Sequence, residues 1–372
     1  MTSNHWHFAR PRLAQAYLAS FHLGLSSARG LFARRRMGKT EFLKQDFIPA
    51  AQADGYMTVY ANLWEMRSDP AIALVSAFFQ AIEPKGFHKL LQKLKPAVKK
   101  IKASGKISGV VEAALETELQ SENKTVAGSL LMDAMRAFDQ TGGKVVMIID
   151  EAQVLAHASN ADFSHALRAA LDIRKDRIKV LFAGSSEATL RKMFGKPSEP
   201  FYNWAALEPF DLLGQEFVEA MVEKVASVSK FPMALNDALY AFDELKRTPE
   251  FFRRYLDRYL TTPFDGAAGA LEYTKSHVFN DASFQQQWQA MLPADRAVLS
   301  LIAAGQTDPY SKDAKEKIAL TLGLAAGKAV ANNTVQNALR RLSEQTILTK
   351  IDRATYQFED EIFADWLKKL LE

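Results

Sequence analysis

A short apolar segment followed by glycine, lysine and threonine constrains this chain more than any other feature of its sequence. Residues 30–33, Gly-Leu-Phe-Ala, are typical of a buried strand. Residues 34–40 read Arg-Arg-Arg-Met-Gly-Lys-Thr, and residues 41–52 have the composition of a helix. Strand, tight loop and helix in this order make a phosphate-binding loop. The backbone N–H groups of such a loop, together with the start of its helix, face a polyphosphate.

Two side chains of this loop have the chemistry that a bound polyphosphate needs. Lys39 would place its ammonium group near the β- and γ-phosphates, and Thr40 would offer its hydroxyl to Mg²⁺. The full motif has glycine where this chain has Ala33; alanine costs about 1–2 kcal/mol there if the position needs a positive φ, and little in the β region. We predict that neighbouring residues also bind the nucleotide, so that the set is Arg35, Arg36, Met37, Gly38, Lys39, Thr40 and Glu41.

A second motif lies about a hundred residues downstream. Residues 144–151 read Lys-Val-Val-Met-Ile-Ile-Asp-Glu, and a continuous apolar run of this kind is typical of a buried parallel strand. Asp150 would emerge at the carboxyl end of the strand, where open α/β sheets bind ligands, and would hold Mg²⁺. Glu151 would orient or deprotonate the attacking water. The alternative for this acidic pair is a solvated strand end.

A third strand, residues 179–183, runs into Gly184-Ser185-Ser186. A small polar residue at this strand end is well placed to touch the γ-phosphate or the attacking water, so we predict a catalytic role for Ser185. The alternative is an ordinary Gly-Ser turn.

With these motifs the chain resembles the AAA+ ATPases, in particular the prokaryotic type related to archaeal ATPases and origin-recognition proteins. The Walker A element is residues 33–40, the Walker B element 145–151 and the sensor-1 region 181–186. The resemblance covers residues 8–262. It implies an α/β fold: a P-loop NTPase parallel sheet with covering helices, a small helical lid and a C-terminal winged-helix domain. ATP and Mg²⁺ are the implied cofactors.

The resemblance also bears on arginines. Residues 200–205 match a family segment that usually carries an arginine where this chain has Asn203-Trp204, so no arginine is predicted there to act across a subunit interface. A lid arginine of these proteins often contacts the γ-phosphate. Arg247, Arg253 and Arg254 are the candidates, and we favour Arg253.

Composition agrees with a soluble, cytoplasmic enzyme that has no membrane partner. The 372 residues carry a formal net charge of +4, which permits contact with nucleic acid without demanding it. The absence of cysteine excludes disulfides and cysteine-based metal sites. No segment approaches the length of a membrane span. We predict an ATPase core over residues 1–210, a lid over 211–262, a linker over 263–283 and a winged helix over 284–372.

The last domain has the element order of a winged helix. Helices are predicted over 295–304, 312–322 and 333–344, followed by strands 347–351 and 355–358 and a closing helix over 361–371. In DNA-binding versions the third helix enters the major groove, where Arg340 and Arg341 would read guanine. However, the domain from Phe284 onward holds eleven basic and eleven acidic residues, and winged helices also contact proteins. The sequence therefore allows either DNA or a protein as the partner of this domain.

The strongest charge feature lies elsewhere, between residues 85 and 106, where eight lysines occur with no acidic residue. It would serve either as a nucleic-acid contact or, as we favour, as the solvated face of an amphipathic helix pair.

Together these features predict a Mg²⁺-dependent ATPase, in which Lys39, Glu151 and Ser185 are catalytic and Thr40 and Asp150 hold the metal. It would couple nucleotide state to double-stranded DNA or to a partner protein, and it could form an oligomer. The alternative is a slow nucleotide-gated switch that binds a protein through its winged helix. A scaffold that has lost hydrolysis is a weaker possibility.

Overall fold

The computed structural model describes residues 5–66, 69–82, 124–139, 143–279, 281–306, 308–325, 327–345, 347–350 and 355–371. The chain forms two compact units. One contains residues 9–33 and 39–210, and the other contains residues 1–8, 34–38 and 211–372. The lysine-rich stretch 85–106 lies outside the described residues, so its prediction is untested.

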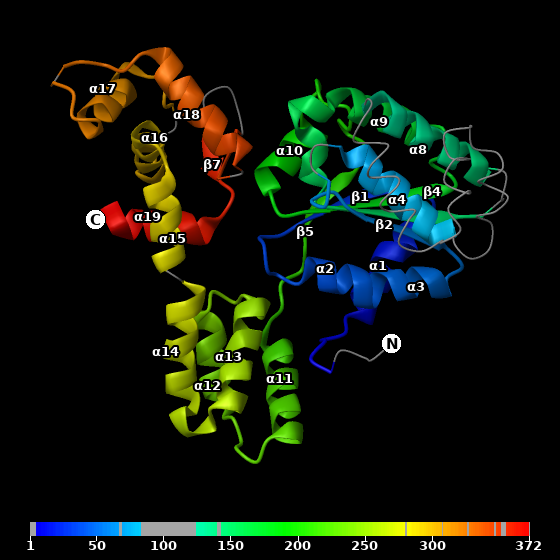
Figure 1. The fold of residues 1–372 in the computed structure, drawn as a ribbon. Helices are drawn as coiled ribbons and strands as arrows, with labels where there is room; N and C mark the ends of the chain where they lie inside the picture. The colour runs from blue at the N-terminus through cyan, green and yellow to red at the C-terminus, as the bar shows by residue number, and fades with distance from the viewer. Residues whose placement is uncertain are drawn as a thin grey trace, which may run out of the picture. The chain divides into compact units, whose positions relative to one another are not determined.

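The first unit is built on a five-stranded parallel sheet (Figure 1). Its strand order is β2-β3-β4-β1-β5, and every pair of neighbours is parallel. All six residues of β3 are buried, as its apolar run predicts for a central parallel strand. The strands are β1 (Ala28–Phe32), β2 (Met57–Asn62), β3 (Val145–Asp150), β4 (Ile178–Gly184) and β5 (Ala206–Pro209).

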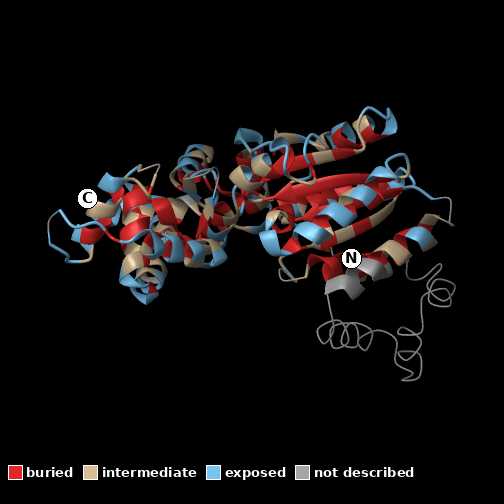
Figure 2. Ribbon diagram, turned by 90° about the horizontal axis from the view of Figure 1, so that it is seen from above, coloured by how far each residue is buried: buried red, intermediate tan, exposed pale blue. Residues whose placement is uncertain are grey.

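Helices cover both faces of this sheet, and its central strands β3 and β4 are buried throughout (Figures 1 and 2). One face carries α1 (Pro11–His22), α2 (Lys39–Phe42) and α3 (Ile48–Ala53). A π-helical segment, Leu43–Phe47, joins α2 to α3. The helix predicted after the loop is therefore continuous, with one wider turn in its middle. The other face carries α4 (Pro70–Ile82), α8 (Lys124–Asp139), α9 (Ala161–Asp172) and α10 (Glu187–Gly195).

The second unit begins with a helical lid that has its own apolar core. Pro249 opens α13, where a missing N–H costs nothing. Residues 263–283, which we expected to act as a linker, include a helix whose Ala270, Leu271 and Val278 belong to this lid core. The lid helices are α11 (Gln215–Val228), α12 (Leu235–Glu244), α13 (Pro249–Thr261) and α14 (Gly266–Val278).

The C-terminal part has the element order predicted for a winged helix. Val335, Leu339 and Leu342 of α18 are buried in its separate core, as their helical spacing predicts. Strands β6 (Leu348–Lys350) and β7 (Tyr356–Phe358) pair antiparallel. The helices are α15 (Asp281–Ala290), α16 (Pro293–Ala303), α17 (Lys312–Thr321), α18 (Asn332–Glu344) and α19 (Glu361–Leu371). Among the described residues, no helix is both long and apolar enough to cross a membrane.

Candidate active site

The sheet order brings the three predicted motifs together at one edge. Strands β3, β4 and β1 are consecutive neighbours and run parallel, so their carboxyl ends lie side by side. Lys39 and Thr40 follow β1 after the loop, Asp150 ends β3, and Ser185 follows β4. Ligands of open α/β sheets bind at this edge.

Asp150 lies at the centre of a hydrogen-bonded group. Its carboxylate is buried, with 1% of the residue exposed. The hydroxyl of Thr40 donates to Oδ2 of Asp150 at 2.8 Å, and the hydroxyl of Tyr60 donates to the same oxygen at 2.9 Å. The backbone N–H of Glu151 donates to the other oxygen at 3.0 Å. The two predicted metal ligands, Thr40 and Asp150, are therefore in direct contact.

Tyr60 was not predicted as a site residue. It lies on β2, and strand β3 pairs with β2 in parallel register. Burial raises the pKa of Tyr60, and the charge of Asp150 and the hydrogen bond to it raise the pKa further. The hydroxyl therefore keeps its proton and remains a donor to the carboxylate at neutral pH.

Lys39 is held inside the loop. Its Nζ donates to the carbonyl oxygen of Ala33 at 2.9 Å, and only 7% of the residue is exposed. Arg36 and Gly38 have positive φ values of 68° and 84°, which curve the loop. Ala33 is not among the residues with positive φ, so alanine in place of the first motif glycine costs little backbone energy.

Glu151 has a left-handed backbone, with φ 55° and ψ 42°. A non-glycine residue held in this region costs of order 1–3 kcal/mol, and such residues cluster at functional sites. The hydroxyl of Ser185 donates to Oε2 of Glu151 at 2.8 Å. Ser185 therefore contacts the predicted general base.

Gln153 completes this arrangement and was missed by the sequence reasoning. Its Nε2 donates to Oε2 of Glu151 at 2.5 Å and to Oγ of Ser185 at 3.1 Å. Gln153 is 7% exposed, and a Cβ added at Gly184 would overlap its Oε1. The glycine that ends β4 thus leaves the space that the amide occupies. The only sequence signal was the position of Gln153 two residues after the predicted base.

The remaining candidates of the loop differ in what they offer. Met37 is buried, so only its backbone is available to a ligand. Arg36 lies 3.8 Å from Glu250 and stands over the ring of Phe251 at 5.2 Å from its centroid. The roles of Arg35 and Glu41 in binding a nucleotide remain predictions.

Two of the three candidate lid arginines, Arg247 and Arg254, form ion pairs within the lid. Arg247 pairs with Asp243 at 2.6 Å, and Arg254 pairs with Glu250 at 2.6 Å. Arg253 is half-buried on α13. Its assignment as the nucleotide-sensing arginine remains a prediction.

The segment 200–205 has a packing role. Phe201 is buried against Phe182 and Phe194, with ring centroids 5.3 and 6.4 Å away. The indole N–H of Trp204 donates to Oδ1 of Asp172 at 3.0 Å. Trp204 is thus held by this hydrogen bond and by the ring of Phe182, 5.7 Å away between centroids.

The two arginines predicted to read DNA have different surroundings. Arg341 forms a salt bridge with Asp295, with Nη2 and Oδ1 2.5 Å apart, and Asp295 is 3% exposed. The pKa of Arg341 is raised by its hydrogen bond to Asp295. Its guanidinium thus pairs with Asp295 while the side chain stays 30% exposed, and its assignment as a base-reading residue remains a prediction. Arg340 is largely exposed and lies 3.5 Å from Glu344.

Comparisons with known proteins agree with this geometry. No family model matches the chain, and no curated protein matches it. Among solved structures, the chain is similar to a Walker-type ATPase of Pyrococcus abyssi, with 16% identity and a TM-score of 0.57 over 97% of this chain and 96% of that chain. It is also similar to the ORC2 protein of Aeropyrum pernix in its ADP form, with 13% identity and a TM-score of 0.56 over 97% and 93%. The predicted fold is confirmed: the chain has the fold of the AAA+ P-loop ATPases.

Proposed function

We propose that this protein binds ATP with Mg²⁺ and hydrolyses the bond between the β- and γ-phosphates. The observation that carries the proposal is the contact of Thr40 with Asp150 at 2.8 Å, beside Glu151 and its partner Ser185. A hydroxyl from the start of α2 and a carboxylate from the end of β3 meet within one group that also holds a candidate base. Mg²⁺ is usually bound by one or two such oxygen ligands together with the phosphates of the substrate, so the residues fit this metal.

Each residue has a separate role in the proposal. Thr40 and Asp150 would hold Mg²⁺, which neutralises charge on the phosphates when it is bound. Lys39 would exchange its contact with the carbonyl of Ala33 for the phosphates. Glu151, fixed by Gln153 and Ser185, would accept a proton from the attacking water. The ORC2 neighbour of similar fold is described in an ADP form, which supports the nucleotide class.

The output of hydrolysis would pass through the C-terminal domain, which we propose acts as a winged helix. DNA is the partner we favour for this domain. The exposed Arg340 on the third helix, α18, supports this proposal because an exposed arginine can reach a guanine edge.

A second candidate function is a slow nucleotide-gated switch whose C-terminal domain binds a protein. The salt bridge between Arg341 and Asp295 supports this candidate, since it engages one of the two arginines proposed to read bases. Fluorescence anisotropy with duplex DNA separates the two. If Arg340→Ala leaves DNA binding unchanged, or if the wild type does not bind duplexes at low salt, the switch is the better description.

The nucleotide site is tested by Lys39→Ala and isothermal titration calorimetry with MgATP and MgADP. A charge-assisted contact is worth roughly 1.5–3 kcal/mol, so the affinity should fall by about tenfold or more. The control is Lys175→Ala, which removes an exposed lysine from the same unit. Equal dissociation constants for Lys39→Ala and the wild type would reject the loop as the nucleotide site.

A further inference from the structure

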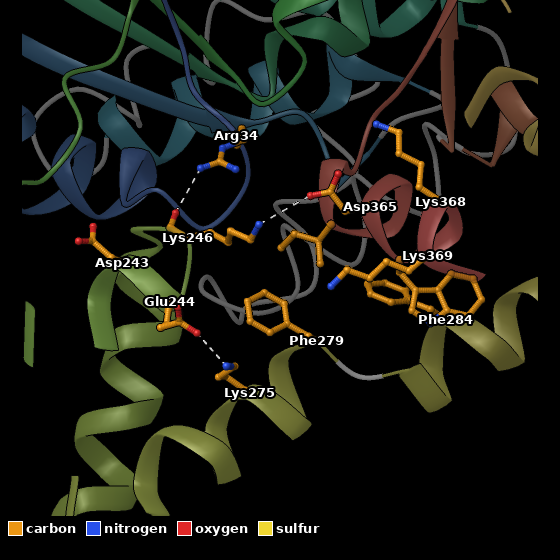
Figure 3. A pocket seen from close by; sticks show the side chains of 12 residues that line it. Arg34, Asp243, Glu244, Lys246, Lys275, Phe279, Phe284, Asp365, Lys368 and Lys369 are labelled. Atoms are coloured by element: carbon orange, nitrogen blue, oxygen red, sulfur yellow. Dashed lines mark hydrogen bonds and ion pairs between the residues drawn. The ribbon is translucent and has the colours of Figure 1, made fainter. Parts of the chain in front are cut away.

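A cavity of about 620 Å³ lies within the second unit (Figure 3), and its lining includes no residue of the hydrogen-bonded group around Asp150. Its walls come from α12, the ends of α14 and α15, and α19, and from Arg34 of the phosphate-binding loop. Its volume falls in the range of about 300–1,000 Å³ that is usual for small-molecule sites. The proposed ATPase does not use it.

The acidic residues of this cavity are neutralised by neighbouring cations. Asp243 pairs with Arg247 at 2.6 Å. Glu244 pairs with Lys275 at 2.8 Å (Figure 3). Asp365 of α19 lies 4.0 Å from Nζ of Lys246. None of these carboxylates is left to attract a cationic ligand.

Two lysines add positive charge to the same wall. Lys368 and Lys369 line the cavity from the last turn of α19, and both are exposed. Neither forms an ion pair with any residue in the part of the chain that the structure describes. Arg34 also lines the cavity, and its Nη2 donates to the carbonyl oxygen of Lys246 at 3.3 Å. The lining therefore carries more positive than negative charge.

Aromatic rings form the apolar part of the lining. Phe279, at the end of α14, lies in Figure 3 between the Glu244–Lys275 pair and Lys369. Phe284 and Trp366 line another part, and their ring centroids are 5.8 Å apart. All three rings are half-buried, so each keeps part of its surface available to a flat ligand. Aromatic rings beside lysines can hold a planar group and a phosphate together.

We propose that this cavity is a second nucleotide site, one that binds a mononucleotide through a stacked base and phosphates paired with Lys368 and Lys369. The base would lie against Phe279, Phe284 or Trp366, and the lysines would act as donors to the phosphate oxygens. The lining includes neither Lys39 nor Thr40, so the site differs from the proposed catalytic site. Since Arg34 belongs to that loop as well as to the cavity lining, a ligand here would contact the segment that also serves the proposed catalytic site.

The test uses the full chain with Lys39→Ala, so that the phosphate-binding loop contributes little, and the probe is mant-ADP, followed by energy transfer from tryptophan. Lys39→Ala should retain one saturable site from which unlabelled ADP displaces the probe. Adding Lys368→Glu with Lys369→Glu should weaken that site by about tenfold or more, because two attractive charges become repulsive. Adenosine, which lacks phosphates, should compete poorly.

The matched control adds Lys328→Glu with Lys350→Glu to the same background. These lysines are exposed in the same unit but do not line the cavity. Both double variants replace two lysines by glutamates, so they change the net charge by the same amount. This variant should bind mant-ADP as Lys39→Ala does. Trp366→Phe should keep the affinity and lower the energy transfer, since it keeps a ring and removes a nearby donor.

Three outcomes would overturn the proposal: no saturable binding in Lys39→Ala, equal binding by the cavity and control variants, or displacement by duplex DNA and not by ADP. Circular dichroism of each variant verifies the fold. The phosphate-binding loop is tested by a different comparison. Both proteins carry Lys368→Glu and Lys369→Glu, and they differ only in having lysine or alanine at position 39. Failure of one site can thus be told from failure of the other.

Discussion

The hydroxyl of Tyr60 donates a hydrogen bond to Oδ2 of Asp150 at 2.9 Å, on the same oxygen that accepts from Thr40. The two donors come from different elements, strand β2 and helix α2, and both act on a carboxylate that is almost fully buried. They fix the direction in which Asp150 presents its remaining lone pairs. Tyr60 is thus a positioning residue for the proposed metal ligand.

Tyr60→Phe should raise the Mg²⁺ concentration needed for half-maximal ATP hydrolysis. The change removes one donor to a buried carboxylate, and a hydrogen bond to a charged group is worth roughly 1.5–3 kcal/mol. Phosphate release measured across a magnesium titration checks this. Tyr56→Phe is the control, because it removes a hydroxyl from a buried tyrosine that stacks against His22. The same magnesium dependence in both variants would show that Tyr60 does not act on Asp150.

Glu151→Gln should keep nucleotide affinity and lose hydrolysis by about 10²–10⁴, because an amide cannot accept the proton of water. Gln153→Ala should lower kcat by a smaller factor than Glu151→Gln does and leave ADP affinity unchanged. It removes a hydrogen bond to Glu151 but leaves the carboxylate in place. Single-turnover phosphate release and calorimetry together measure both quantities. Wild-type hydrolysis by Glu151→Gln would exclude Glu151 as the base.

Arg341→Ala and Arg340→Ala should differ in their effect on stability. Arg341→Ala leaves the buried carboxylate of Asp295 without its guanidinium partner, and a buried acceptor left in this way costs roughly 1–3 kcal/mol. Arg340 forms an exposed pair with Glu344, so its replacement should change the free energy of unfolding by about 0.5 kcal/mol or less. Urea unfolding of both variants tests the difference. A comparable loss of stability in both would contradict the structural role of Arg341.

The free energy of unfolding should fall as pH rises from about 10 to 12. Burial, followed by the nearby Tyr310, raises the pKa of Tyr356 to about 12, so the folded chain holds this proton after the unfolded chain has released it. The stability contributed by the neutral phenol is complete below the unfolded pKa of about 10 and is lost through the folded pKa. In urea unfolding at several pH values, Tyr356→Phe should show a shallower decline. An unchanged slope would mean that Tyr356 titrates alike in both states.

Much of this protein could be predicted from short stretches of its sequence. The loop ending in Gly38-Lys39-Thr40 and the apolar run before Asp150 specify their elements locally, because a tight loop and a fully buried parallel strand each need particular residue types in consecutive positions. The helical spacing of Val335, Leu339 and Leu342 likewise predicts the buried face of α18.

Other relationships depend on which elements become neighbours. Tyr60 and Asp150 are 90 residues apart in the chain, and only the pairing of β2 with β3 brings them into contact. Arg341 was predicted to contact DNA from its place on the third helix, and only the fold shows that its guanidinium pairs with Asp295, 46 residues earlier. Local patterns determine which face of an element is buried. The partners of a polar side chain are decided by the packing of distant elements, since a buried charge or donor must find its partner wherever the fold places one.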